Sequence, residues 1–161
     1  MNDDHYFMHQ ALKQAQRAYQ ADEVPIGAII VREDKIIARA FNQVEMLRDA
    51  TAHAEILVIT QAEAALGDWR LNECDLYVTK EPCPMCAGAV VLSRLRRVIF
   101  GCHDPRGGAA GGFINLLQTP NLGHRCLITG GVCEEESRHL LQAFFGEKRA
   151  ERKSVSIPVK G

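Results

Sequence analysis

Apolar and polar positions change their period along the chain, and the changes mark the predicted elements. Residues 5–19 carry apolar side chains at helical spacing, so we expect an amphipathic helix that packs on a core. Two apolar runs rich in β-branched residues follow at 27–31 and 35–40, separated by the polar segment 32–34, and this pattern predicts a β-hairpin. A second helix is expected over residues 52–66, because Gly67 provides a typical stop signal.

The second half of the chain alternates short apolar runs with helical patterns. Strands are expected at 76–79, 97–101 and 126–129, and helices at 84–92 and 134–147. Pro82 and Pro84 favour a helix start at this point. Strands that alternate with helices predict an α/β fold, in which a mixed sheet is covered by helices. Right-handed crossovers would bring the strand ends beside the helix starts.

Length and hydropathy point to a globular protein. The 161 residues predict one domain over residues 1–161, whose C-terminal helix and basic tail begin at about residue 134. The hydrophobic fraction of 47% is ordinary for a chain with a real core. No apolar run is long enough to span a bilayer. The first five residues lack the features of a signal peptide, so we expect a cytoplasmic protein without membrane contact.

The net charge of −1 gives no global sign of nucleic-acid binding, but basic residues gather locally. Arginines stand at positions 94, 96, 97 and 106. The C-terminal tail carries a second group, which consists of Lys148, Arg149, Arg152, Lys153 and Lys160. A basic tail is either a solvated helix end or a phosphate contact, and the sequence leaves both open.

Six cysteines occur, of which only Cys83 and Cys86 are closely spaced. A reducing compartment argues against a disulfide framework. The other four are expected to be small buried hydrophobic residues: Cys74, Cys102, Cys126 and Cys133.

Two short motifs carry the chemistry. The first is His53-Ala54-Glu55, and the second runs from Pro82 to Cys86 with the pattern P-C-x-x-C. Two cysteines three apart at a helix start point to one side, and the helix N-terminus stabilises the thiolate that binds zinc. His53 would be the third ligand. Three protein ligands leave one tetrahedral position for water, which is the arrangement of a catalytic zinc site.

Glu55 is either an exposed helix carboxylate or a proton shuttle beside the metal. Because zinc acidifies water, a neighbouring carboxylate can accept its proton and pass protons to the substrate. The pattern H-x-E…P-C-x-x-C is the established signature of the zinc-dependent nucleobase deaminases. A closed structural zinc site would need Cys102 or His103 as a fourth ligand, and a redox Cys-x-x-Cys would leave the first motif unexplained.

Nearly the whole chain resembles the bacterial tRNA-specific adenosine deaminases. The resemblance is carried by residues 23–28, 50–55, 76–79, 81–89, 104–108, 115–117, 124–125 and 144–145. It implies a three-layer α/β/α cytidine-deaminase-like fold with a central mixed five-stranded sheet, a homodimer, and one Zn²⁺ per chain. It also implies conversion of adenosine to inosine at the wobble position of a tRNA anticodon, within the anticodon stem-loop, after the nucleotide is flipped into the zinc pocket.

The resemblance also implies substrate contacts. Ile26 and Asn42 match positions near the base and ribose, and Ala54 is also expected to bind substrate. Positions near the flanking nucleotides are matched by Asp104, Arg106, His124, Phe144, Phe145 and Arg149. Splayed bases are read by stacking and edge hydrogen bonds, which suits aromatic and arginine side chains. Each residue also has an ordinary structural explanation, as a strand residue, turn former, core aromatic or solvated charge.

Three positions depart from the family pattern. Lys80 replaces a usual leucine, and it would contact phosphate or pair with Glu81. Gly123 replaces an asparagine common before His124, and Gly146 stands where a basic residue is frequent. Two other functions remain open: a deaminase of a small free base or nucleoside (guanine, cytosine or cytidine), and a zinc-stabilised RNA-binding module without catalysis.

Overall fold

The computed structural model describes residues 3–155, and Lys160 of the predicted basic tail lies outside the described residues. The elements occur in the order α1 (Asp4–Gln20), β1 (Gly27–Arg32), β2 (Lys35–Phe41), α2 (Val44–Leu47), α3 (Ala54–Leu66), β3 (Cys74–Lys80), α4 (Pro84–Ser93), β4 (Arg97–Cys102), the 3₁₀ helix η1 (Pro120–Leu122), β5 (Leu127–Thr129) and α5 (Glu134–Val155). Each predicted helix and strand is therefore present.

The five strands form one sheet in the order β2-β1-β3-β4-β5. Strand β1 runs antiparallel to both β2 and β3, whereas β3, β4 and β5 are parallel. Helix α4 is the crossover between the parallel strands β3 and β4, so its N-terminus lies at the carboxyl end of β3. The predicted mixed five-stranded sheet is confirmed.

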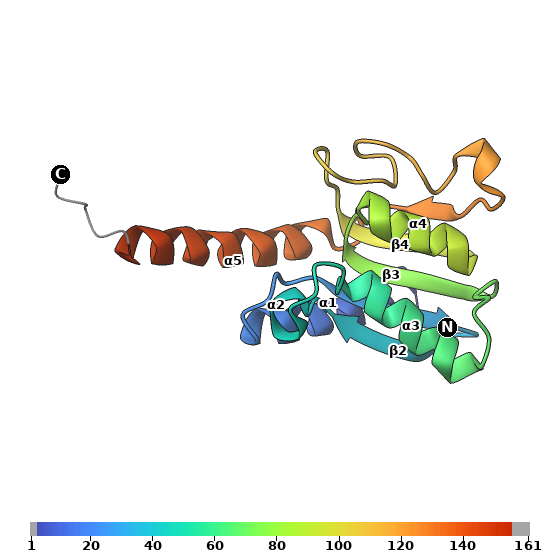
Figure 1. Ribbon diagram of the computed structural model, residues 1–161, viewed down its shortest axis with the longest axis horizontal. Helices are drawn as coiled ribbons and strands as arrows, with labels where there is room; N and C mark the ends of the chain where they lie inside the picture. Colours follow the sequence, from blue (N-terminus) through green and yellow to red (C-terminus); the bar gives the residue numbers. More distant parts are fainter. Residues whose placement is uncertain (1–2, 156–161) are drawn as a thin grey trace.

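Side chains of β1 alternate between two apolar clusters. Ala28 and Ile30 pack into the larger cluster, which includes buried residues of α3 and α4. Ile29 and Val31 pack into the other cluster, against the buried face of α1. A strand that buries both of its faces needs helices on both sides of the sheet. Figure 1 shows this arrangement, with α3 and α4 on one face and α5 extending beyond the sheet.

The structure corrects some predicted boundaries. Helix α5 continues through Gly146 to Val155 instead of ending at residue 147, because Glu, Lys, Arg and Ala are strong helix formers. His53 is the extended residue that precedes α3, so this helix begins later than predicted. Helices α2 and η1 were not predicted, because a single turn is too short to show a hydrophobic period.

The structure also gives the partners of two arginines and the burial of the cysteines outside the two motifs. Arg96 and Arg97 pair with Asp75 and Asp4, so these arginines do not form a free basic surface. The prediction of burial is confirmed for Cys74, Cys102 and Cys126, whereas Cys133 is only partly buried. Among the described residues, no helix is long and apolar enough to cross a membrane.

Candidate active site

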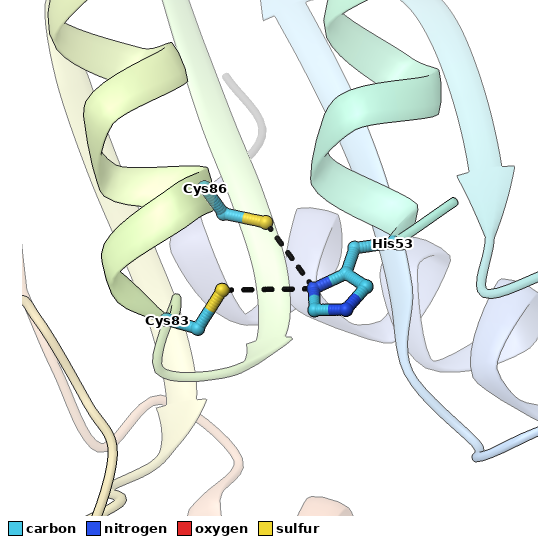
Figure 2. A group of neighbouring side chains, drawn as sticks. All are labelled: His53, Cys83 and Cys86. Atoms are coloured by element: carbon cyan, nitrogen blue, oxygen red, sulfur yellow. Dashed lines mark hydrogen bonds between the residues drawn. The ribbon is translucent and has the colours of Figure 1, made fainter. Parts of the chain in front are cut away.

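His53, Cys83 and Cys86 meet between the N-terminal ends of α3 and α4. The Nδ1 atom of His53 lies 3.6 Å from the Cys83 sulfur and 3.4 Å from the Cys86 sulfur. Figure 2 shows the imidazole facing both sulfurs from the opposite helix. One ligand atom from each residue lies within 4.8 Å of the others, so the group can hold a metal ion.

Local sequence explains this convergence. Cys83 is the residue before α4, and Pro84 occupies the first helical position with a backbone angle that suits a helix start. Cys86 follows one turn later and therefore points to the same side as Cys83. His53 occupies the equivalent position before α3.

The pKa values of the two thiols are shifted in opposite directions. A hydrogen bond from the Cys86 thiol, reinforced by His53, lowers the pKa of Cys83 to about 4. The same hydrogen bond raises the pKa of Cys86. Cys83 is therefore a thiolate at neutral pH, which is the form that binds metal. One imidazole and two cysteine sulfurs are a donor set that suits zinc.

Glu55 lies in the first turn of α3, beside the metal-binding group. It is buried, and burial raises the pKa of its carboxyl group. Its Oε1 is the only buried side-chain oxygen or nitrogen without a hydrogen-bond partner among the residues described with side chains. A buried carboxylate oxygen of this kind requires a partner that the chain itself does not supply, such as water or a ligand. The alternative of an exposed helix carboxylate is wrong.

A cavity of about 860 Å³ opens beside His53. Four of the predicted substrate contacts line this cavity: Ile26, Asn42, Phe144 and Phe145. A smaller adjoining cavity of about 260 Å³ is lined by three of them, Asp104, Phe145 and Arg149. Lys80 and Phe145 line both cavities. Residues from distant segments thus surround one hollow region next to the metal-binding group.

Asn42 and Ala54 contact each other. The carboxamide oxygen of Asn42 accepts the backbone N–H of Ala54 at 2.7 Å, and Asn42 is buried. This bond fixes the orientation of the Asn42 side chain in the cavity wall. Asn42 is therefore more than a turn former, because it also holds the start of α3 in place.

Arg106 and His124 do not line either cavity. The Arg106 backbone N–H donates to the Asp104 carboxylate, and its side chain is exposed. The His124 Nε2 donates to the carbonyl oxygen of Leu95, which follows α4 at the end away from Cys83. Their roles as substrate contacts stay predictions.

Phe144 and Phe145 differ in their surroundings, although the sequence offered core packing and base contact for both. Phe144 is buried and packs edge-on against Tyr19 of α1, whereas Phe145 is 42% exposed. Phe144 is therefore part of the helix packing as well as of the cavity wall. Phe145 presents an open aromatic surface to both cavities.

Lys80 has a partner that the sequence did not identify. Its ammonium group lies 3.3 Å from the Asp104 carboxylate, so the suggested pairing with Glu81 is wrong. Burial raises the pKa of Asp104, but Lys80 and two backbone N–H groups outweigh this effect and hold the pKa below its ordinary value. Glu81 is unavailable to Lys80, because backbone N–H groups surround it.

Two buried glutamates hold segments beside the site through backbone N–H groups, a role that was not predicted for either. The Glu81 carboxylate accepts the backbone N–H groups of Asp104, Ala110 and Gly112. The Glu23 carboxylate accepts two backbone N–H groups at the start of α2. For Glu81, the cluster of glycines at 107, 108, 111 and 112 was the available signal, since glycine permits close backbone approach.

The other two departures have local explanations. Gly123 has a positive φ of 77°, a backbone conformation that glycine adopts more readily than asparagine. Gly146 lies within α5, and a Cβ there would have ordinary space beside Arg149.

Comparison with known proteins agrees with the fold and the site. The family of MafB19-like deaminases matches residues 1–149. This match, together with the fold and the site, identifies a deaminase. The chain is 51% identical to a tRNA-specific adenosine deaminase of Bacillus subtilis over 96% of both chains. It is 47% identical to one of Aquifex aeolicus, over 89% of this chain and 95% of that protein. The chain belongs to the family of tRNA-specific adenosine deaminases.

Solved structures of deaminases have the same fold as this chain. A structure from a study of A-to-I editing by tRNA:A34 deaminases at the wobble position has a TM-score of 0.81 and 46% identity, and it covers 84% of this chain and 99% of its own. A guanine deaminase from Bacillus subtilis has a TM-score of 0.61 and 36% identity, over 63% of this chain and 66% of its own. Both adenosine and guanine deaminases thus share this architecture.

Proposed function

We propose that this protein is a zinc-dependent hydrolase that converts adenosine to inosine at the wobble position of a tRNA anticodon. The observation that carries the proposal is the His53, Cys83 and Cys86 group beside the unpartnered buried carboxylate of Glu55. The names of the similar proteins support the choice of substrate.

His53, Cys83 and Cys86 would hold one zinc ion per chain. Zinc in such a site supplies the acidity that makes water a nucleophile near neutral pH. Glu55 would accept a proton from the attacking water and return protons to the ring nitrogen and the departing amine. Burial raises the pKa of Glu55 above its ordinary value, which suits a group that must both accept and donate protons.

The cavity walls would hold the flipped nucleotide. Ile26 and Asn42 contact the base and ribose in this proposal, with Ala54 behind Asn42, and Phe145 offers a ring on which a flanking base can stack. Arg149 lines the smaller cavity, where its guanidinium group can contact a neighbouring nucleotide or phosphate. Asp104, Phe144, Arg106 and His124 complete the proposed contact set.

We also propose a homodimer of one-domain chains that acts in the cytoplasm. Large apolar side chains are exposed on α4, on the loop between β4 and β5 and on β5: Leu92, Phe113 and Leu127 are 76%, 67% and 63% exposed. A second copy of this chain would cover such side chains. The cytoplasm follows from the proposed tRNA substrate.

The decisive experiment offers the protein an anticodon stem-loop, free guanine, cytosine and cytidine in parallel. Sequencing the reacted RNA after reverse transcription reads inosine as guanosine and locates the edited position. We expect conversion of the wobble adenosine alone. Strong turnover of a free base with none on the stem-loop would instead identify a small-molecule deaminase.

Glu55→Ala tests the mechanism within the same assay. We expect zinc content to be retained and turnover to fall by about 10²–10⁴-fold, the usual contribution of a general acid–base group. Glu63→Ala, on the same helix but only partly buried and outside both cavities, is the matched control and should keep full turnover. Near-normal turnover in Glu55→Ala, or stem-loop binding without ammonia release by the unmodified protein, would contradict the proposal.

A further inference from the structure

A second group of metal-binding side chains lies outside the candidate active site. It consists of His9 on α1, Cys133 immediately before α5, and Glu136 in the first turn of α5. The His9 Nε2 atom lies 3.2 Å from a Glu136 carboxylate oxygen and 4.0 Å from the Cys133 sulfur. One ligand atom from each of the three residues lies within 4.8 Å of the others.

The tautomer of His9 suits a metal ligand. Its Nδ1 lies 2.7 Å from the carbonyl oxygen of His5, one helical turn earlier. A carbonyl oxygen can only accept, so Nδ1 carries the hydrogen. Neutral His9 therefore presents the lone pair of Nε2 to Cys133 and Glu136. A histidine that binds metal usually donates its other ring N–H to such a carbonyl, which fixes the ring orientation.

The group shares its ligand spacing with the candidate active site. In both places a cysteine precedes a helix, a second ligand follows three residues later, and a histidine comes from a distant segment. Tetrahedral zinc bonds of about 2.0 Å to nitrogen and 2.3 Å to sulfur place these two atoms roughly 3.5 Å apart. The 4.0 Å between His9 Nε2 and the Cys133 sulfur is a few tenths of an ångström longer, which an exposed histidine can close.

Neighbouring charges leave Glu136 available as a ligand. Glu134 and Glu135 lie in the same turn, but both are paired with Arg138. Glu136 instead faces His9. An ordinary ion pair between His9 and Glu136 would account for these two residues alone. It would not account for the thiol of Cys133, which is only partly buried and stands beside both.

We propose that His9, Cys133 and Glu136 form a second, exchangeable site for zinc or a similar borderline-soft divalent cation. Thiolate, imidazole and carboxylate together are ligands that such cations prefer over calcium or magnesium. The site joins two helices whose ligands are 124 residues apart in sequence. Because the end of α1 and the middle of α5 also border the large cavity, occupancy would hold α5 in its place beside that cavity.

Zinc stoichiometry tests this proposal. The full chain is dialysed to equilibrium against zinc buffered at micromolar free concentration, and bound metal is measured per chain. We expect Cys133→Ser and His9→Gln each to bind one zinc fewer than the unmodified protein. His139→Gln is the matched control, because His139 is an exposed histidine of α5 outside the group, and its count should be unchanged.

The measured quantity is the difference in bound zinc between each variant and the unmodified protein. Zinc at His53, Cys83 and Cys86 contributes equally to both counts, so the difference reports on the second site alone. Cobalt provides a second readout: a thiolate–cobalt absorption band should be weaker in Cys133→Ser than in the unmodified protein. Equal zinc counts in the unmodified protein and Cys133→Ser would overturn the proposal. A count that fell equally in His139→Gln would also overturn it, since exposed histidines in general would then be binding the metal.

Discussion

Glu81→Gln removes one charge from the carboxylate that holds the loop beside the candidate active site. Glu81 is 3% exposed, and its two oxygens accept three backbone N–H groups at 2.9, 3.1 and 2.8 Å. Glutamine has the same size, so the close approach of Gly108 and Gly112 is undisturbed. One side-chain oxygen becomes an NH₂ group, which faces a backbone donor and cannot accept from it.

The expected loss of stability follows from these bonds. A buried N–H group without a partner costs about 1–3 kcal/mol, and the other two bonds each weaken by about 1 kcal/mol when the acceptor loses its charge. Removing the buried charge also removes part of the free-energy cost of taking that charge out of water, and this offsets some of the loss. We therefore expect the free energy of unfolding to fall by about 2–4 kcal/mol. Turnover should fall as well, because the loop carries Asp104, which pairs with Lys80 at the cavity.

Urea unfolding at constant free zinc, followed by circular dichroism, measures the change. Glu73→Gln is the control, because Glu73 is an exposed glutamate whose ion pair with Arg32 is open to solvent. Such pairs contribute little, so its urea midpoint should barely move. Equal midpoints for Glu81→Gln and Glu73→Gln would refute the reasoning that Glu81 anchors the loop.

Three further substitutions test contacts that hold the fold together. Gly27→Ala places a Cβ 2.2 Å from a backbone oxygen of α1 and should lower the melting temperature, whereas Gly88→Ala, which meets open space within α4, should not. Asn42→Ala leaves a buried N–H at the start of α3 without its acceptor, and thermal unfolding should show a loss of about 1–3 kcal/mol. Burial raises the pKa of Asp4, but hydrogen bonds from Arg97 and a buried tyrosine outweigh it and hold the pKa below 3.8. The stabilisation is therefore present above pH 3.8 and is lost as pH falls further, and Asp4→Asn should remove this acid dependence from urea midpoints measured below pH 4.

The sequence by itself predicted the sheet and the main helices, because apolar periodicity and helix stop signals are local properties. It also predicted that Cys83 and Cys86 would face one side, since three residues nearly complete one helical turn. The H-x-E motif placed Glu55 near His53 for the same local reason. These inferences needed no knowledge of which distant segments meet.

Tertiary structure decided everything that depends on contact between distant segments. Lys80 lies beside Asp104, and Glu81 lies among the glycines of the loop, only because β3 and β4 pair in parallel register. His9 meets Cys133 because α1 and α5 pack together at one face of the sheet. No periodic pattern in the sequence predicts such pairs. The secondary structure of a residue depends mainly on its neighbours in the chain, whereas the partner of its side chain depends on strand register and helix packing.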